Sequence, residues 1–178
     1  MIRTLLAALL ATSVFAVEVD GVSVPDKAEL AGAAVPLRGA AMMTYKWVFD
    51  LYVAGLYVAK DAADPVVASP KRLRMDYVRD IPREKMVEAT DETIGRGLTP
   101  AQAAAIHASQ QTWNALYPAP KKGEHLTFDH LADGTLIMAL NDKELGRVKD
   151  EAFARALFAI WIGADPVKES VRDALVAK

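Results

Sequence analysis

The chain contains no cysteine, and this absence excludes several kinds of chemistry. Disulfides, thiolate zinc sites, iron–sulfur clusters and cysteine nucleophiles all need that residue. The chain also lacks an excess of charge of either sign, because 21 basic residues stand against 23 acidic residues. A nearly balanced charge argues against a surface that binds the phosphates of nucleic acids. We therefore expect no nucleic-acid partner.

Motifs of the common cofactor and hydrolase sites are missing as well. No serine lies in a G-x-S-x-G elbow, and neither Gly32 nor Gly95–Gly97 forms a dinucleotide or phosphate-binding loop. The three histidines, His107, His125 and His130, do not stand at metal-ligand spacing on the expected elements. The sequence thus predicts no metal site, no cofactor and no catalytic residue of these kinds.

The first residues have the pattern of a secretory signal peptide. Arg3 precedes an apolar run that begins at Leu5, and Val14 and Ala16 stand at the two positions that signal peptidase reads. A membrane anchor is the alternative, but a bilayer span needs about 20 apolar residues and this run is shorter. We expect cleavage after Ala16, with residues 1–16 as signal peptide and residues 17–178 as one periplasmic domain without a membrane span.

The first half of the domain has the pattern of strands. Residues 17–24 alternate around Asp20-Gly21, which predicts a hairpin. The small residues from Ala28 to Ala41 indicate a loop or a close approach of two backbones. Residues 45–60 are rich in aromatic and β-branched side chains and predict two strands or one bent strand. Residues 72–79 alternate basic or polar with apolar residues, which predicts a half-exposed strand.

The second half alternates between helical and strand patterns in long blocks. Thr99 and Pro100 have the residue types of a helix cap and a first helical position. The expected elements are helices over 82–96 and 99–117, strands over 125–131, 135–140 and 145–148, and helices over 150–162 and 165–177. Strands and helices in separate runs predict an α+β fold with an antiparallel sheet covered by helices.

The densest feature of the chain is an aromatic cluster in residues 45–57. Its members are Tyr45, Trp47, Phe49, Tyr52 and Tyr57. Alternation places the first three on one face of a regular strand. Two interpretations are open. The cluster can belong to a core that packs against the helix carrying Trp161, or it can line a cavity in which tyrosine hydroxyls orient a lipophilic ligand.

Three segments resemble the chalcone isomerase-like family, and most of all its exported bacterial branch. The segments are LRGAAMMTYKWVFDLYVAGLYVA (37–59), RLRMDYVRDIPREKMVEA (72–89) and ALFAIWIGADPVKESVRDALV (156–176). The resemblance implies the open-faced β-sandwich of that family, in which helices cover a large antiparallel sheet. It agrees with the α+β order read from the residues.

The catalytic residues of the plant enzymes in this family carry over in part. In those enzymes an arginine holds a phenolate, and a tyrosine and a lysine polarise a ketone. One register of the resemblance places the arginine at Met43, and another places it at Arg38. Tyr52 stands where a threonine of the sheet would be, and Lys85 matches the lysine.

The remaining positions of the family pattern carry apolar residues here. The tyrosine falls on Pro82, the asparagine on Ala89 and the last threonine on Ile160, beside Trp161. Each missing donor of such a site costs about 2.7–4 kcal/mol of transition-state stabilisation, although the losses do not simply add. The resemblance therefore implies an apolar cleft that binds rather than catalyses.

The function implied is non-catalytic binding of a small lipophilic molecule, such as a fatty acid or a flat hydrophobe, between sheet and helices. The expected ligand-binding residues are Arg38, Met43, Tyr52, Lys85, Ile160 and Trp161. Two alternatives stay open. One is an isomerase or lyase of the chalcone isomerase type that acts on an unsaturated ketone. The other is a structural or protein-interaction role in the envelope, with the cleft filled by the protein's own side chains.

Overall fold

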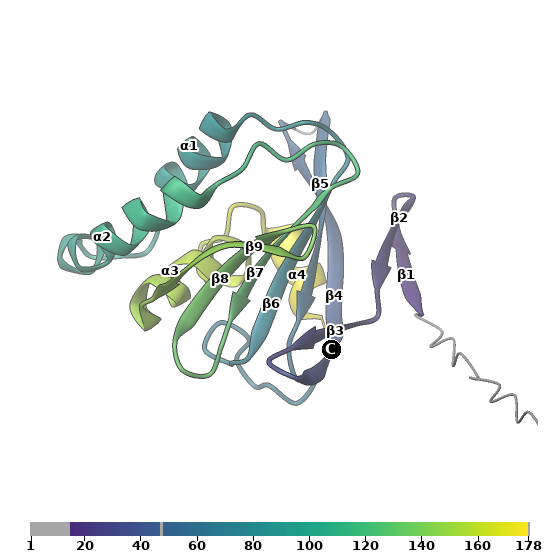
Figure 1. The fold of residues 1–178 in the computed structure, drawn as a ribbon, viewed down its shortest axis with the longest axis horizontal. Coiled ribbons are helices and arrows are strands. Elements are labelled where there is room, and N and C mark those ends of the chain that lie inside the picture. Colours follow the sequence, from purple (N-terminus) through teal and green to yellow (C-terminus); the bar gives the residue numbers. More distant parts are fainter. Residues whose placement is uncertain (1–14, 47, 178) are drawn as a thin grey trace, which may run out of the picture.

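A curled antiparallel sheet dominates the computed structural model, which describes residues 15–46 and 48–177 (Figure 1). Its strands lie side by side in chain order, and each pairs with the next. They are β3 (Lys27–Leu30), β4 (Ala33–Tyr45), β5 (Phe49–Tyr57), β6 (Lys71–Tyr77), β7 (His125–His130), β8 (Thr135–Leu140) and β9 (Lys143–Lys149). A separate hairpin of β1 (Ala16–Val19) and β2 (Val22–Pro25) precedes them.

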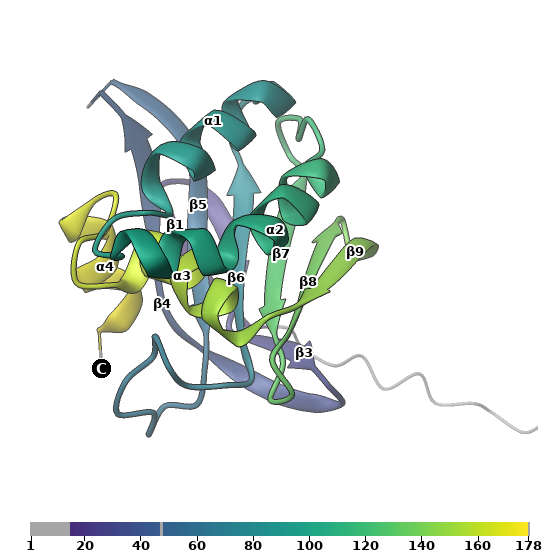
Figure 2. The ribbon, with the colours of Figure 1, turned by 90° about the vertical axis from the view of Figure 1, so that its left-hand side faces the viewer.

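The helices lie together on one face of this sheet (Figure 2). They are α1 (Arg83–Thr93), α2 (Pro100–Leu116), α3 (Glu151–Ile162) and α4 (Glu169–Val176). The β1–β2 hairpin lies on the opposite side (Figure 1). The predicted α+β fold, an open antiparallel sheet covered by helices, is confirmed. Within the described ranges no helix combines the length and apolar character needed to cross a bilayer.

Turns and caps form where the local sequence predicts them. Asp20-Gly21 joins β1 to β2 with positive φ at both residues, as a tight hairpin turn requires. Thr99 accepts a hydrogen bond from the backbone of Gln102 and completes a capping box at the start of α2. Asp150 caps α3 by accepting from the backbone N–H of Phe153 at 3.0 Å.

Two segments differ from the sequence-based expectation. The small residues from Ala28 to Ala41 form β3 and most of β4, so the loop interpretation is wrong. The close backbone approach expected there is confirmed at Gly39, where an added Cβ would lie 2.0 Å from the carbonyl oxygen of Ala174 in α4. The last helix begins at Glu169 and not at Asp165-Pro166.

Residues 45–60 contain the last residue of β4 and the whole of β5, so the segment holds one complete strand and only the end of another. Tyr45 pairs with Phe49 across the turn of this hairpin, and both side chains are about half exposed. Trp47, which was expected to share their face, lies outside the described residues. The aromatic cluster is therefore divided between an exposed hairpin tip and the interior.

The strand β5 is buried on both of its faces, because a core cluster lies on either side of it. Ala54 and Leu56 belong to the larger cluster, between the sheet and the helices. Val53 and Tyr57 belong to the smaller cluster, which includes Val24 of the β1–β2 hairpin. The alternation of a strand thus divides β5 between two cores.

The contact between α4 and β4 makes Gly39 a position that tolerates no side chain. We expect Gly39→Ala to lower the free energy of unfolding by about 1–3 kcal/mol, because the new methyl group forces α4 off the sheet. Urea denaturation of the two proteins measures the difference. Gly95→Ala is the matched control, since a Cβ there meets open space, and its change should stay within about 0.5 kcal/mol.

Candidate functional site

Aromatic side chains fill the space between the sheet and the helices, and we call this set the aromatic layer. Its members come from β5, β6, β7, α2, α3 and the residue that ends α2: Tyr52, Tyr77, Trp113, Tyr117, Phe128, Phe153 and Trp161. Neighbouring rings lie 5.1–6.1 Å apart between centroids and are tilted or edge-to-face. Such pairs add to the stabilisation given by burial alone.

Strand register places part of this layer in one row. Met43, Tyr52 and Tyr77 are direct neighbours across β4, β5 and β6. Residues that pair directly in antiparallel strands point to the same face. The row therefore faces the helices, and the Tyr52 and Tyr77 rings lie 5.3 Å apart.

The layer contains three tyrosine hydroxyls, and each has a partner from a covering element. The Nε1 of Trp161 donates to the Tyr52 hydroxyl at 2.9 Å. The Tyr77 hydroxyl donates to the sulfur of Met86 in α1 at 3.5 Å. The Tyr117 hydroxyl and the Oγ1 of Thr90 in α1 lie 2.8 Å apart. The hydroxyls thus tie the sheet and the end of α2 to α1 and α3.

Burial holds these phenols in the neutral state. Desolvation raises the pKa of Tyr52 and that of Tyr77 well above the ordinary value, and it raises the pKa of Tyr117 to about 12. Repulsion between ionised tyrosines raises two of these pKa values further: Tyr117 acts on Tyr52, and both Tyr52 and Tyr117 act on Tyr77. At physiological pH the layer therefore offers hydrogen-bond donors that carry no charge.

The accessibility of the layer is uneven. Tyr77, Trp113, Tyr117 and Phe128 are almost fully buried. Tyr52 is only partly buried. Its hydroxyl oxygen accepts from Trp161, while no described residue accepts the Tyr52 hydroxyl proton. A ligand that reached this point would meet a donor in apolar surroundings.

The helix α1, which contacts Tyr77 and Tyr117, makes several polar contacts with α2. Asp91 accepts hydrogen bonds from Gln110 at 2.6 Å and from Asn114 at 2.8 Å. Arg83 donates to the backbone carbonyl of Asn114 at 2.9 Å. The buried residues of α1 are Thr90 and Thr93. This helix therefore contributes less apolar contact than α3, most of whose side chains are buried.

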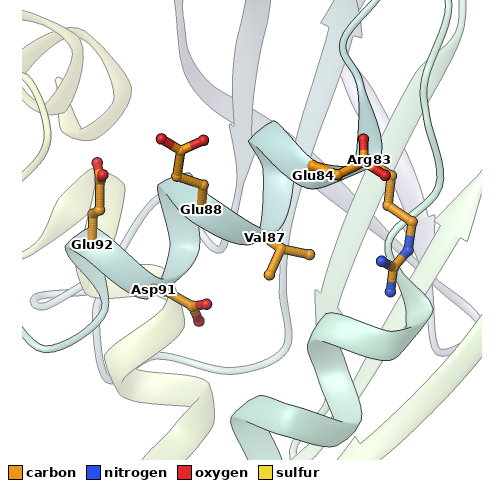
Figure 3. Close-up of a pocket in the computed structure, with 6 residues that line it drawn as sticks. All are labelled: Arg83, Glu84, Val87, Glu88, Asp91 and Glu92. Carbon is orange, nitrogen blue, oxygen red and sulfur yellow. The ribbon is translucent and has the colours of Figure 1, made fainter.

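An open hollow runs along α1 (Figure 3). Arg83, Val87 and Asp91 point toward α2 in this view, while Glu88 and Glu92 point away from it. The hollow is lined by α1 alone, and several of its lining residues are carboxylates. Residues 15–46 and 48–177 contain no group of side chains that could hold a metal ion. A second hollow lies between α1 and α2, beside Ile94 and His107. Neither hollow includes Tyr52 or Trp161.

A second buried polar cluster lies at the other end of β6 and β7. The ammonium of Lys71 donates to the carbonyl of Val66 and lies 4.7 Å from the centre of the Phe158 ring. Burial lowers the pKa of Lys71 to about 8. His130 pairs with Lys71 in the sheet, and its Nε2 lies 2.9 Å from a carboxylate oxygen of Glu151. These contacts fix the loop before β6 and the first turn of α3.

Four of the six residues predicted to bind a ligand lie on the helix side of the sheet, where three are buried and Tyr52 is partly buried. Met43 neighbours Tyr52 in the sheet, and Tyr52 is hydrogen-bonded to Trp161. Ile160 precedes Trp161 in α3 and belongs to the same core cluster. The structure therefore brings Met43, Tyr52 and Trp161 together, with Ile160 beside them in α3.

The two predicted cations lie elsewhere. Arg38 donates to the carbonyl of Ala62 at 2.8 Å and to that of Val176 at 3.2 Å, near the far end of β5. Lys85 projects from α1 with most of its side chain exposed, and its Nζ lies 2.5 Å from a carboxylate oxygen of Glu88. Neither cation contacts the tyrosines of the layer.

Tyr77, Tyr117 and Thr90 belong to the site but were not among the predicted residues. Tyr77 stands at the last apolar position of the alternation in 72–79, and Tyr117 ends the apolar stripe of α2. These patterns predict burial for both residues. They do not predict that both hydroxyls lie in the same layer as Tyr52, because that depends on how α1 and α2 cross the sheet.

Comparisons with known proteins agree with the fold described above. A family model described as chalcone isomerase-like matches residues 16–177. Among solved structures, a fatty-acid binding protein of Arabidopsis thaliana is similar, with a TM-score of 0.71 and 17% sequence identity. The alignment covers 88% of this chain and 92% of that one. No curated protein sequence matches the chain.

The raised pKa of Tyr117 predicts a loss of stability at alkaline pH. In the unfolded chain a tyrosine ionises near pH 10, whereas the pKa of Tyr117 in the folded protein is about 12. Its contribution is therefore complete below pH 10 and is lost as the pH rises from about 10 to 12. The free energy of unfolding should fall between about pH 9 and pH 11 in both proteins. We expect this fall to be about 1 kcal/mol smaller in Tyr117→Phe than in the unmodified protein, because phenylalanine does not ionise. Urea denaturation at the two pH values measures this, and an equal loss in both proteins would contradict it.

Proposed function

The chain belongs to the chalcone isomerase-like family, and from this we propose that it binds a small lipophilic molecule in the aromatic layer without catalysing a reaction. The similar structure from Arabidopsis thaliana is described as that of a fatty-acid binding protein. A fatty acid or another hydrophobe with one polar end is therefore the ligand class that we propose.

The partly buried Tyr52 hydroxyl is the observation that carries this proposal. It accepts from Trp161, its own proton has no acceptor among the described residues, and the Tyr52 ring packs beside that of Tyr77. A ligand carboxylate or carbonyl can accept that proton, while its apolar part packs against Met43 and Trp161. Mostly apolar sites with a few placed donors are the usual form of small-molecule sites.

The placement of the cations favours binding over the isomerase alternative. Activation of a ketone needs charge or several donors aimed at the oxygen on which negative charge develops. Arg38 binds backbone carbonyls and Lys85 pairs with Glu88, so neither provides such a donor to the layer. The neutral tyrosines can hold a polar end but are too weakly acidic to serve as proton donors near pH 7.

One observation supports a second candidate, in which the layer is filled by the protein's own side chains. Tyr52 and Trp161 are hydrogen-bonded to each other, and their rings pack within the aromatic layer. In that case the domain would serve a structural or protein-interaction role. Direct measurement of ligand binding separates the two candidates.

The test compares two tyrosines on opposite faces of β5. Tyr52 faces the layer, whereas Tyr57 faces the smaller core and donates to the carbonyl of Pro25 at 2.9 Å. We expect hexadecanoic acid to bind the unmodified protein. Tyr52→Phe should raise the dissociation constant by roughly tenfold or more, because the ligand carboxylate loses a hydrogen bond. Tyr57→Phe, which loses an equivalent hydroxyl outside the layer, should leave the affinity unchanged. Isothermal titration calorimetry provides both constants.

Three other results would contradict the proposal. A protein that binds neither hexadecanoic acid nor a flat hydrophobe would support the filled layer. Equal weakening by Tyr52→Phe and Tyr57→Phe would mean that the ligand lies elsewhere. Turnover of a chalcone above the buffer rate, abolished by Lys85→Ala and Arg38→Ala, would establish the isomerase alternative.

We further propose that the chain belongs to the exported bacterial branch of the family and acts in the periplasm after cleavage behind Ala16. The family match and β1 both begin at residue 16, which supports a boundary at this point. We expect the intact mass of the protein from the periplasmic fraction of producing bacteria to lack residues 1–16. An unprocessed chain in the cytoplasmic fraction would overturn this.

A further inference from the structure

The end of the β4–β5 hairpin exposes apolar side chains that the aromatic layer does not use. Of the large hydrophobic side chains exposed within the described ranges, Tyr45, Val48 and Phe49 lie together in this segment, and we call these three residues and Lys46 the hairpin tip. Val48 is 74% exposed, which is the largest value in that set. Apolar groups gathered at one exposed point mark a contact surface more often than singly scattered ones do.

Cations flank these apolar residues. The ammonium of Lys46 lies 5.2 Å from the centre of the Tyr45 ring, and the guanidinium of Arg79 lies 5.1 Å from that of Phe49. Neither cation forms a salt bridge with another described residue. Lys168 also reaches this region, where its Nζ contacts the Oγ1 of Thr44. Asp50, which follows Phe49, is an exposed carboxylate in the same hairpin. With Lys46 and Arg79 against Asp50, the tip presents a small excess of positive charge, although the whole chain has a net charge of −2.

This combination fits the polar–apolar boundary of a bilayer. Aromatic rings occupy that boundary because one edge can stay wet while the ring is buried, and lysine and arginine bind the anionic headgroups beside it. A protein interface of standard size instead needs about 800 Å² from each partner, which the few residues of the tip do not offer. A narrow tip is better suited to insertion among lipids than to docking on a flat protein surface.

We propose that the hairpin tip docks on membranes with anionic phospholipids, with Val48 inserting at the headgroup boundary and Lys46 and Arg79 contacting the phosphates. This inference does not depend on whether the aromatic layer holds a ligand. The two properties use different residues, so either one can fail while the other holds.

The absence of cysteine makes a position-specific test possible in the full chain. Val48→Cys is labelled with a nitrobenzoxadiazole dye, whose fluorescence rises when it enters an apolar environment. The matched control is Val67→Cys, because Val67 is 47% exposed and lies in the loop that follows the opposite end of β5. We expect vesicles of phosphatidylcholine and phosphatidylglycerol to raise the signal at position 48 but not at position 67.

A second pair of variants tests the role of charge in the labelled Val48→Cys protein. Lys46→Glu should shift the vesicle titration midpoint by at least about fivefold, since one charge near an anionic surface changes affinity by about that factor. Lys60→Glu makes the same charge change beyond the opposite end of β5 and should leave the midpoint unaltered. Vesicles of phosphatidylcholine alone should give a weaker signal.

Several outcomes overturn the proposal. A flat signal at position 48, or equal signals at positions 48 and 67, would show that the tip does not insert. Equal effects of Lys46→Glu and Lys60→Glu would show that general charge and not the tip attracts the vesicles. A signal at position 48 that rises with protein concentration in the absence of vesicles would assign the tip to self-association.

Discussion

The register between β4, β5 and β6 is the constraint on which the aromatic layer depends. It sets Met43, Tyr52 and Tyr77 side by side on the face that the helices cover. A shift of one residue would turn Tyr52 toward the β1–β2 hairpin and bring Val53 into the layer. Since β5 has a core on both faces, such a shift would disrupt two cores at once. Burial on both sides thus fixes the row of tyrosines.

The division between neutral and charged groups follows from the cost of burying charge. An isolated ion in an apolar layer is strongly destabilising, whereas a hydrogen-bonded hydroxyl is tolerated. The chain accordingly places tyrosines within the layer and pairs its cations outside it, as with Arg72 and Asp129, whose two contacts measure 2.6 and 2.7 Å. Lys71 is buried but is compensated by a carbonyl and an aromatic ring. The layer therefore suits a ligand with one acceptor better than a reaction that develops charge.

Local sequence predicted the elements well because alternation and capping act over a few residues. It predicted the segment before Ala41 less well, since small residues have little strand propensity. They form β4 because α4 approaches the backbone at Gly39, which is a tertiary requirement. The same limit applies to the site. The resemblance matched Arg38 to the family's arginine by its place in the sequence. In the structure, β4 has a register shift at this residue, and the Arg38 side chain donates to two backbone carbonyls instead of entering the aromatic layer. Tyr77 and Tyr117 were identifiable as buried residues, but not as neighbours of Tyr52.

The hairpin tip and the aromatic layer are close along the same strand. Phe49 and Tyr52 are three residues apart on β5, or roughly 10 Å. The segment between β6 and α1 follows this stretch, because the backbone N–H of Val78 donates to the carbonyl of Leu51 at 3.1 Å and Arg79 lies over Phe49. A surface that held the tip would therefore lie next to the start of α1. Since the buried residues of α1 are two threonines, its displacement would expose less apolar surface than that of α3. The tip and Tyr52 thus lie on one strand, next to a segment that leads into the helix with the least buried apolar contact.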